Sequence, residues 1–593
     1  MDNKFKKQHK EMGEVKVSQI KRLGKYAKPY KKQIAVTVTY MMIATITGLL
    51  GPYLLRYAID DYIPNENFNA VVVISGIFLV ALIVNYICNR KKIAIANLTG
   101  QSILLDIRRD LFDRIQTLSF RFFDKTSTGR LIVCVINDVN RLNDLFTDGL
   151  VNVITDLSML VVAAVIMVII HPGLALLTFT TVPIFLIVLF MLRNYIKTRW
   201  RDVRIKLSNL NAYIHECIVG MRVIQAYVRQ AKNRKKFERV SNDIFHSWMK
   251  AVVINTGFGP LVNFVAVLGS AIIYWYGAYL LQIEGVTIGV IIAFTVYLQR
   301  FWDPVNTLSN FYNQMLIAMA SSERIFEFID EKPDVCEVPD ATYVPKFKGK
   351  VVFENVHFAY EPDKPVLENV SFSVSPGETI AIVGPTGSGK STIINLLTRF
   401  YDITAGNIKI DNYDIKEITL ATLRERIGVM LQEPFIFSGS IKDNIMYGKA
   451  DAKIEEVIQV AKAVSAHEFI VQMEQGYDTM VNERGSRLSI GQKQLVAFAR
   501  VLLRNPDILI LDEATASVDT HTEKILQKAI DKLLEGRTSF VIAHRLSTIR
   551  NADRIMVIDK GRIAQMGSHD ELMAQKGLYY QLYEVQYKFL DAL

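Results

Sequence analysis

The sequence predicts a chain of two parts, an all-α membrane domain followed by a soluble α/β domain. Three observations support this prediction. Half of the 593 residues are hydrophobic and 22% are charged, and the two kinds are segregated, because long apolar runs lie between residue 34 and about residue 330. From about residue 345 the pattern changes to alternating strands and helices. Within that second part, a glycine-rich loop follows an apolar run at 379–383 and precedes a helical pattern at 392–400.

The membrane domain is expected over residues 1–329, with six spanning helices. A span needs roughly 20 apolar residues to cross about 30 Å of hydrocarbon. Six runs meet this requirement, near 34–59, 70–88, 150–170, 174–192, 252–281 and 286–306. The first run begins behind a lysine-rich stretch and is not followed by a small-residue cleavage site, so we interpret it as a span and not as a signal peptide. Six crossings place both termini on one side.

The positions of Lys and Arg indicate which side that is. The loops expected outside, 60–69, 171–173 and 282–285, contain neither residue, whereas 4–32, 89–92 and 193–206 are rich in both. By the positive-inside rule, both termini and the second domain are cytoplasmic, which predicts a multi-pass protein of the cytoplasmic membrane. The formal charge of +10 then reflects topology and anionic membrane lipid, and no motif for nucleic acid accompanies it.

Polar segments separate these parts further. Two long helical insertions, 91–148 and 193–250, are expected to project into the cytoplasm, where connections of such length are usually functional. The polar, proline-bearing segment 330–349 is predicted to link the two domains, so that the second domain covers 350–593. Four cysteines, at 88, 134, 217 and 336, lack metal-type spacing and imply no disulfide framework.

The glycine-rich loop at 384–391 fits the pattern G-x-x-x-x-G-K-[ST]. Its glycines allow backbone amides to surround phosphates, Lys390 can hold the β and γ phosphates, and Ser391 can ligate Mg²⁺. A glycine-rich turn before an ordinary helix is the alternative. The strand before the loop and the helix after it favour a nucleoside triphosphate, ATP, with Mg²⁺. The expected contacts are Gly384, Pro385, Thr386, Gly387, Ser388, Gly389, Lys390, Ser391 and Thr392.

Two later motifs extend this pattern. The apolar run 508–511 ends in Asp512 and Glu513, and 488–492 reads Leu-Ser-Ile-Gly-Gln. Together with the loop, these motifs resemble ABC transporters, and nearly the whole chain resembles a half-transporter of the ABC exporter class. The resemblance implies an all-α six-helix transmembrane domain with long cytoplasmic helical extensions, followed by an α/β P-loop ATPase domain. It also implies ATP-driven export of amphipathic or hydrophobic small molecules, drugs or lipids, by alternating access. A peptide exporter, an ATP-gated channel or an importer on the same scaffold remain alternatives.

The resemblance also assigns roles to residues around the nucleotide. Tyr360 matches the aromatic residue that stacks on adenine. Gln432 matches the glutamine that joins Mg²⁺ and the attacking water to the membrane half, and with Ser391 and Asp512 it completes the expected metal ligands. Glu513 matches the general base.

Other residues match contacts of the γ-phosphate and of a second copy. His544 matches the histidine that senses the γ-phosphate. Ser517 and Asp519 match the loop that crosses to the partner site.

The resemblance makes a dimer a mechanistic requirement, because each nucleotide lies between the loop of one ATPase domain and the Leu-Ser-x-Gly-Gln segment of the other. Ser489, Gly491 and Gln492 are the expected contacts in that segment. The departure is Ile490, where the usual residue is glycine, and a positive φ there would be costly for a β-branched residue. We expect nucleotide to bind while hydrolysis at that site is impaired. A heterodimer with a paralogous half-transporter is favoured, with a homodimer as the alternative.

The remaining expectations concern coupling and cargo. Segments 120–130 and 211–220 resemble the two coupling regions of exporters. Ionisable groups at membrane depth, Asp156, Arg300 and Asp303, are costly unless they face a cavity or one another, and the i, i+3 spacing of the last two also suits a structural ion pair. Three aromatic residues of the sixth span are candidates to line a cavity for an amphipathic cargo: Tyr297, Phe301 and Trp302.

Overall fold

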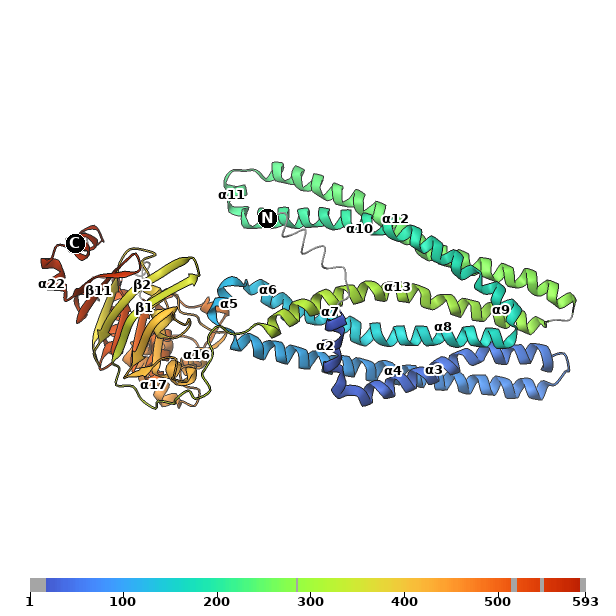
Figure 1. Cartoon of the computed structure of the whole chain (residues 1–593), viewed down its shortest axis with the longest axis horizontal. Coiled ribbons are helices and arrows are strands. Elements are labelled where there is room, and N and C mark those ends of the chain that lie inside the picture. Colours follow the sequence, from blue (N-terminus) through green and yellow to red (C-terminus); the bar gives the residue numbers. More distant parts are fainter. Residues whose placement is uncertain (1–16, 284–285, 513–519, 544–548, 587–593) are drawn as a thin grey trace. The chain divides into compact units, whose positions relative to one another are not determined.

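The computed structural model describes residues 17–283, 286–512, 520–543 and 549–586 (Figure 1). The chain divides into two compact units, one formed by Met1–Gln116 and Thr128–Glu331 and the other by Thr117–Ser127 and Lys332–Leu593. The short segment 117–127 lies within the sequence of the first domain, but it packs with the second unit. The predicted fold class, a helical membrane domain followed by an α/β domain, is confirmed, whereas the boundaries at residues 329 and 350 stay predictions.

The first unit consists of helices throughout its described residues (Figure 1). All six predicted spans fall largely within helices, and the third coincides with its helix. The helices are α2 Val17–Ala27, a 3₁₀ turn Lys28–Tyr30, α3 Lys31–Tyr57, α4 Phe68–Thr117, α6 Thr128–Val133, α7 Val139–Asp144, α8 Leu150–Ile170, α9 Pro172–Phe179, α10 Thr181–Val219, α11 Met221–Ala226, α12 Gln230–Gln282 and α13 Ile288–Asp330, with π-helical turns at Ala58–Tyr62, Cys134–Asp138 and Leu145–Gly149.

Helix length separates the spanning segments from their extensions. Helix α4 has 50 residues, which corresponds to about 75 Å and exceeds the roughly 30 Å of hydrocarbon. Among the described residues, Ser18–Tyr62, Phe68–Thr117, Thr128–Ile170 and Asn263–Gln282 are long and apolar enough to cross a membrane, and Pro172–Phe185 and Ile288–Trp302 are shorter apolar stretches. Six crossings therefore stay a prediction.

The predicted fourth span contains a break. Helix α9 ends at Phe179 and α10 begins at Thr181, two residues before Pro183. A proline lacks the amide hydrogen that a continuous helix needs, but it is tolerated in the first turn of a new one. Helix α9 itself starts with Pro172, and the side chain of His171 accepts a hydrogen bond from Leu174 N at 3.0 Å.

The core of the first unit corrects one expectation. Tyr297, Phe301 and Trp302 on α13 are at most 6% exposed and pack among apolar side chains of α8, α9 and α12. The hydroxyl of Tyr297 donates to Leu49 O at 2.8 Å. The prediction that these aromatic residues line a cavity is therefore wrong, because helix packing buries them.

A buried ion pair joins two helical segments of the first unit. Asp138 is 1% exposed and accepts hydrogen bonds from Arg324 on α13, with Nε at 2.7 Å and Nη2 at 2.5 Å. Ser321 Oγ also donates to Asp138, at 3.1 Å. Removing one partner would leave the other charge buried and uncompensated, which is strongly destabilising. The ion pair therefore holds α13 against the segment before α7.

The second unit is built on two larger sheets. The six-stranded sheet has the order β12-β11-β3-β10-β9-β6 and is parallel except for β12, and the antiparallel sheet has the order β2-β1-β4-β5. The strands are β1 Val351–Glu361, β2 Lys364–Val374, β3 Thr379–Val383, β4 Ala405–Ile410, β5 Tyr413–Asp414, β6 Ile427–Met430, β7 Gly439–Ser440, β8 Met480–Val481, β9 Ile508–Asp512, β10 Thr538–Ile542, β11 Arg554–Asp559 and β12 Arg562–Gly567.

Helices cover these sheets, and side chains of β3 alternate between two apolar clusters. Ile380 and Ile382 pack toward the antiparallel sheet, and Ala381 and Val383 pack toward the helical side, as the period of two in a strand requires. The helices are α5 Phe120–Lys125, α14 Lys390–Leu397, α15 Leu420–Arg426, α16 Ile441–Met446, α17 Ile454–Ala463, α18 His467–Val471, α19 Ile490–Arg504, α20 Thr520–Leu534, α22 His569–Ala574 and α23 Leu578–Gln586, with 3₁₀ turns at Gly476–Asp478 and Glu483–Gly485.

The predicted linker is largely packed against this second unit. Val344 and Phe347 are 7% and 2% exposed and belong to its core. Backbone hydrogen bonds join Thr342 to Glu417 and Thr419, at 2.7 and 3.1 Å. The polar composition of 330–349 indicates a linker between the domains. The two buried apolar side chains show that part of this segment packs into the core of the second unit.

Candidate nucleotide site

Three glycines shape the loop between β3 and α14. Gly384, Gly387 and Gly389 have φ values of +152°, +82° and +109°, where residues with a Cβ are strained. A Cβ on Gly384 would lie 2.1 Å from Ile558 O, and one on Gly389 would lie 2.7 Å from Leu367 Cδ2. The loop therefore needs glycine for its backbone conformation and for its close packing.

The polar side chains of this loop are partly enclosed. Lys390, the first residue of α14, donates from Nζ to Gly384 O at 2.8 Å and to Pro385 O at 2.9 Å. Burial lowers the pKa of Lys390, and the negative charge of Asp512 opposes that shift. Ser388 Oγ is buried and has no hydrogen-bond partner among the described residues. An ammonium group and an unsatisfied hydroxyl at the start of a helix suit a phosphate.

Tyr360 lies near the end of β1, beside the same helix. Its hydroxyl is 3.3 Å from Thr392 Oγ1 and accepts a hydrogen bond from Asn395 Nδ2 at 3.2 Å. Its ring makes edge contacts with Phe358 and Tyr401, with centroid distances of 4.8 and 5.0 Å. The structure thus brings the predicted adenine-stacking residue together with Thr392, one of the predicted contacts of the loop.

The parallel sheet gathers the expected metal ligands at one edge. Ser391 follows β3, Asp512 ends β9, and Gln432 lies two residues after β6; these strands all point in the same direction, with β10 between β3 and β9. Hydroxyl, carboxylate and amide oxygens are hard donors, which are the ligands that Mg²⁺ prefers. The chemistry of these side chains therefore fits Mg²⁺.

Four of the predicted residues lie outside the described residues: Glu513, Ser517, Asp519 and His544. Their roles as general base, partner contact and γ-phosphate sensor stay predictions.

The Leu-Ser-Ile-Gly-Gln segment forms the start of α19. Ser489 is the N-cap: its Oγ accepts from Gln492 N at 3.2 Å, and its own N donates to Gln492 Oε1 at 2.9 Å. Gly491 is buried in the first turn. This reciprocal capping satisfies the backbone amides of Ser489 and Gln492 and leaves those of Ile490 and Gly491 available.

Ile490 corrects a second expectation. It is the first residue of α19 and is absent from the set of described residues with positive φ. A β-branched residue is compatible with helical backbone at this position, so the costly positive φ does not occur, and the expected impairment of hydrolysis stays a prediction. The side chain is 55% exposed, and any effect of Ile490 must come from its size at the surface.

A partly buried arginine links this helix to the segment after Gln432. Arg500 on α19 donates to Phe435 O at 3.0 Å and to Asn444 O at 2.8 Å, and its guanidinium lies 5.9 Å from the ring centroid of Phe437. Burial lowers the pKa of Arg500. Arg500 therefore bonds α19 to the segment that follows Gln432.

The first predicted coupling region contacts the same unit. Phe120 of α5 packs on Phe400 with ring centroids 4.2 Å apart, and the hydroxyl of Tyr401 donates to Asp124. Burial and this carboxylate raise the pKa of Tyr401. Tyr401 thus touches both α5 and the ring of Tyr360. Sequence reasoning missed Tyr401; its position in the aromatic pair 400–401, directly after α14, was the available signal. The second coupling region, 211–220, belongs to the other unit.

This combination, a helical membrane unit fused to a P-loop ATPase unit, defines an ATP-dependent membrane transporter. The chain matches two family descriptions, the ABC transporter transmembrane region over residues 34–305 and the ABC transporter over residues 367–516. It belongs to the ABC transporter family and is a multi-pass membrane protein.

Several relatives resemble it over nearly their whole length. It is 45% identical over 576 residues to the uncharacterized ABC transporter ATP-binding protein YknV of Bacillus subtilis, covering 96% of this chain and 95% of that protein. It is 38% identical to the putative multidrug export ATP-binding/permease protein YgaD of Bacillus subtilis, covering 96% and 99%. The ATP-dependent lipid A-core flippase of Syntrophus aciditrophicus is 35% identical, covering 97% and 96%.

A solved structure supports the same arrangement. The structure of a bacterial Atm1-family ABC exporter with ATP bound matches with a TM-score of 0.79 and 27% identity, and the match covers 94% of this chain and 98% of that one. The predicted resemblance to exporter-type half-transporters is therefore confirmed.

Proposed function

We propose that this chain is one half of an exporter that uses ATP to move amphipathic or hydrophobic small molecules, drugs or lipids, out across the cytoplasmic membrane. The observation that carries the proposal is the packing of α5 in the ATPase unit, because this segment is continuous in sequence with α4 and α6 of the membrane unit. Nucleotide-driven movement of the ATPase unit would pull on both helices. The exporter names of YgaD and of the lipid A-core flippase support the direction and the kind of cargo.

The ATP site would use the groups already placed around the loop. Its backbone amides and Lys390 would hold the phosphates, and Tyr360 would stack on adenine. Ser391, Gln432 and Asp512 would hold Mg²⁺, which neutralises phosphate charge when bound. Glu513 would orient and deprotonate the attacking water, and His544 would contact the γ-phosphate.

The second half of each site would come from a partner chain. Ser489, Gly491 and Gln492 would contact the γ-phosphate held by the partner, and Asp519 would cross the interface. A paralogous partner is favoured, because Ile490 adds an exposed apolar side chain where this chain would meet the partner's nucleotide; a homodimer is the alternative. The ATPase unit and both termini would lie in the cytoplasm, as the positive-inside rule indicates.

The test starts with the chain alone in lipid nanodiscs, where oligomeric mass and Mg²⁺-dependent ATPase activity are measured beside Glu513→Gln. We expect the substitution to abolish turnover and keep ATP binding. Unchanged ATPase activity would contradict the assignment of Glu513. A homodimer with turnover would reject the paralogous partner, whereas turnover that appears only with a co-expressed paralogue would support it.

Transport itself needs a flux measurement. Inside-out vesicles should accumulate a fluorescent amphiphile against its gradient when ATP is added. Flux only down the gradient would indicate a channel, and loss of amphiphile from the vesicle interior would indicate import. Either result would overturn the proposal.

A further inference from the structure

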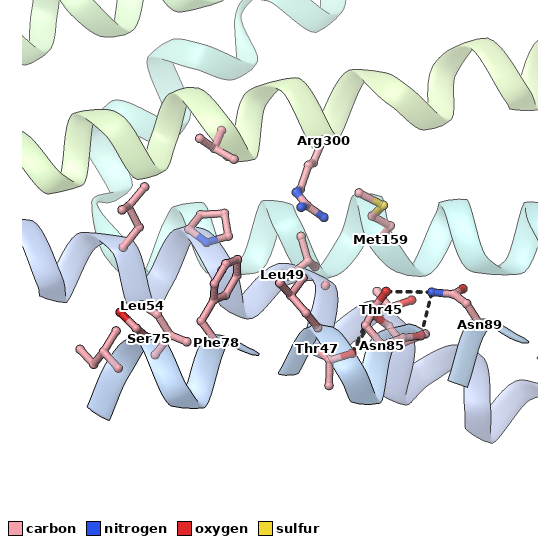
Figure 2. Close-up of a pocket in the computed structure, with 18 of the residues that line it drawn as sticks. Thr45, Thr47, Leu49, Leu54, Ser75, Phe78, Asn85, Asn89, Met159 and Arg300 are labelled. Carbon is pink, nitrogen blue, oxygen red and sulfur yellow. Dashed lines mark hydrogen bonds between the residues drawn. The ribbon is translucent and has the colours of Figure 1, made fainter. Parts of the chain in front are cut away.

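A cavity of about 540 Å³ lies among α3, α4, α8 and α13 of the membrane unit (Figure 2). Two glycines of α3 line it and allow α4 to pack closely against α3. A Cβ on Gly51 would lie 2.8 Å from Phe78 Cε2, and a Cβ on Gly48 would lie 3.3 Å from Asn85 Nδ2 and 3.6 Å from Arg300 Nη1. Larger residues at these positions would therefore collide with Phe78 and crowd Asn85, two side chains that line the cavity.

Arg300 is the one ionisable side chain among the described residues that line this cavity. It extends from α13 into the space above Leu49 (Figure 2). No ion pair to Arg300 occurs among the described side chains, and the side chain of Asp303 lies outside them. A guanidinium group within a spanning segment is costly unless an anion or water-filled space compensates its charge. The cation thus marks the cavity as a place for a negatively charged group.

Polar groups cluster toward one end of the cavity. Asn85 Nδ2 donates to Ala44 O at 2.6 Å and to Thr47 Oγ1 at 3.2 Å, and Asn89 Nδ2 donates to Asn85 Oδ1 at 2.9 Å. These bonds fix both amides. Thr45 Oγ1, in contrast, is buried and has no partner among the described residues. A hydroxyl donor and the guanidinium therefore remain for a ligand at this end.

The other end of the cavity is largely apolar. Leu54, Leu55, Ile74 and Phe78 line it, beyond the position of Arg300. From Asn89 to Ile74, α4 rises by about 22 Å, the length of an extended alkyl chain with its head group. A volume of about 540 Å³ suits one such chain and is small for a lipid with two. The polarity and length of the walls together specify the ligand.

We propose that this cavity binds a single-chain amphiphile with an anionic head group, with Arg300 as the head-group ligand and the apolar end as the site of the tail. The inference rests on the proposed export function, since it names the class of cargo. Carboxylate, phosphate and sulfate heads share the required chemistry: each accepts several hydrogen bonds from a guanidinium.

Photo-crosslinking to the full chain in phosphatidylcholine nanodiscs, without nucleotide, tests this site directly. The probe is a 12-carbon carboxylate with a diazirine near its tail, and labelled peptides are identified by mass spectrometry. We expect labelling of α3 and α4 near Phe78. Dodecanoate should compete, and dodecyltrimethylammonium should not. Because a charged hydrogen bond contributes on the order of ten- to a hundredfold in affinity, Arg300→Gln should weaken labelling at least about tenfold.

Two further variants make the result decisive. Arg300→Lys should retain preference for the anion, and Arg239→Gln, which removes an exposed cation outside the cavity, should leave labelling unchanged. If Arg300→Gln is unstable, the Lys variant still decides, since equal labelling by anionic and cationic probes would overturn the proposal. Undiminished labelling of a stable Arg300→Gln would also overturn it.

Two remaining arms separate this site from its alternatives. Competition by phosphatidylglycerol but not by dodecanoate would assign the cavity to a two-chain lipid and reject the single-chain ligand. Selective labelling without ATP-driven flux of dodecanoate would support the binding site and contradict the proposed export function. Flux of other amphiphiles without selective labelling would support the export function and contradict the binding site.

Discussion

Gly384→Ala provides a sharp test of the phosphate-loop geometry. The added methyl group would lie 2.1 Å from Ile558 O, a backbone atom of β11. To reach an ordinary contact of 3.4 Å, the loop or the strand must move by about 1.3 Å. Strand β11 is held to β3 by a parallel ladder that pairs Val557 with Val383, so we expect the loop to move.

The size of the effect follows from what that movement displaces. Backbone strain at a positive φ costs on the order of 1–3 kcal/mol, and a hydrogen bond to a charged phosphate contributes about 1.5–3 kcal/mol. Loss of one such bond together with part of the strain gives about 3 kcal/mol, so ATP should bind on the order of 100-fold more weakly. A nucleotide titration of the full chain in nanodiscs, without Mg²⁺ to prevent turnover, measures this change.

Two glycines supply matched controls. Gly377 has φ +79° and open space around a Cβ, and it lies at the opposite end of β3. Gly377→Ala should lower stability by about 1–2 kcal/mol without changing ATP affinity. Gly387, at φ +82° with equally open space, lies in the loop and should give an intermediate loss. If Gly384→Ala binds ATP within about threefold of the unsubstituted chain, the steric reasoning is refuted.

Three further predictions concern the same unit. Lys390→Ala should weaken ATP binding at least about tenfold, because it removes a charged donor; normal affinity in the same titration would count against the loop as the nucleotide site. Ile490→Gly should change stability by only about 0.5 kcal/mol and should raise the ATPase rate of the assembled dimer, and an unchanged rate would mean that isoleucine is tolerated. Tyr401→Phe removes the hydroxyl that donates to Asp124 but keeps the ring. Because Asp124 is exposed, the loss is about 1 kcal/mol; we expect near-normal ATP affinity and a lower ratio of cargo moved to ATP hydrolysed, with Tyr413→Phe as an exposed control.

The sequence predicts the architecture well because strong local patterns determine it. Six long apolar runs fall largely within helices, and the phosphate loop lies between a strand and a helix as its motif requires. The motif also locates Asp512, since a strand that ends in a carboxylate needs no tertiary information to be recognised. Local patterns fail where partners distant in sequence decide the environment. Phe301 and Trp302 have the composition of cavity-lining residues, yet packing against other helices buries them.

The same reason explains what sequence analysis missed in the site. The contact between Tyr401 and Asp124 joins residues 277 positions apart, and neither residue carries a motif of its own. The strain expected at Ile490 depended on a backbone conformation that the sequence did not specify. Arg300 was recognised as costly, but the cavity that it lines is formed by side chains from four helices, which no local pattern shows.

Contacts within the ATPase unit indicate how nucleotide binding would reach the membrane helices. The ring of Tyr360 contacts Tyr401, Tyr401 donates to Asp124 on α5, and α5 connects α4 to α6 along the chain. If adenine stacks on Tyr360, any change in that ring's position alters the edge contact with Tyr401 first. Tyr401 is 6% exposed and has little room to adopt a new position by itself. A displacement of Tyr401 would therefore displace α5 as well. Through these contacts, the position of α5 would depend on the nucleotide base. The segment after Gln432, which Arg500 binds, would respond to the γ-phosphate. The two routes predict that substituting Tyr401 weakens coupling without affecting the chemistry of hydrolysis.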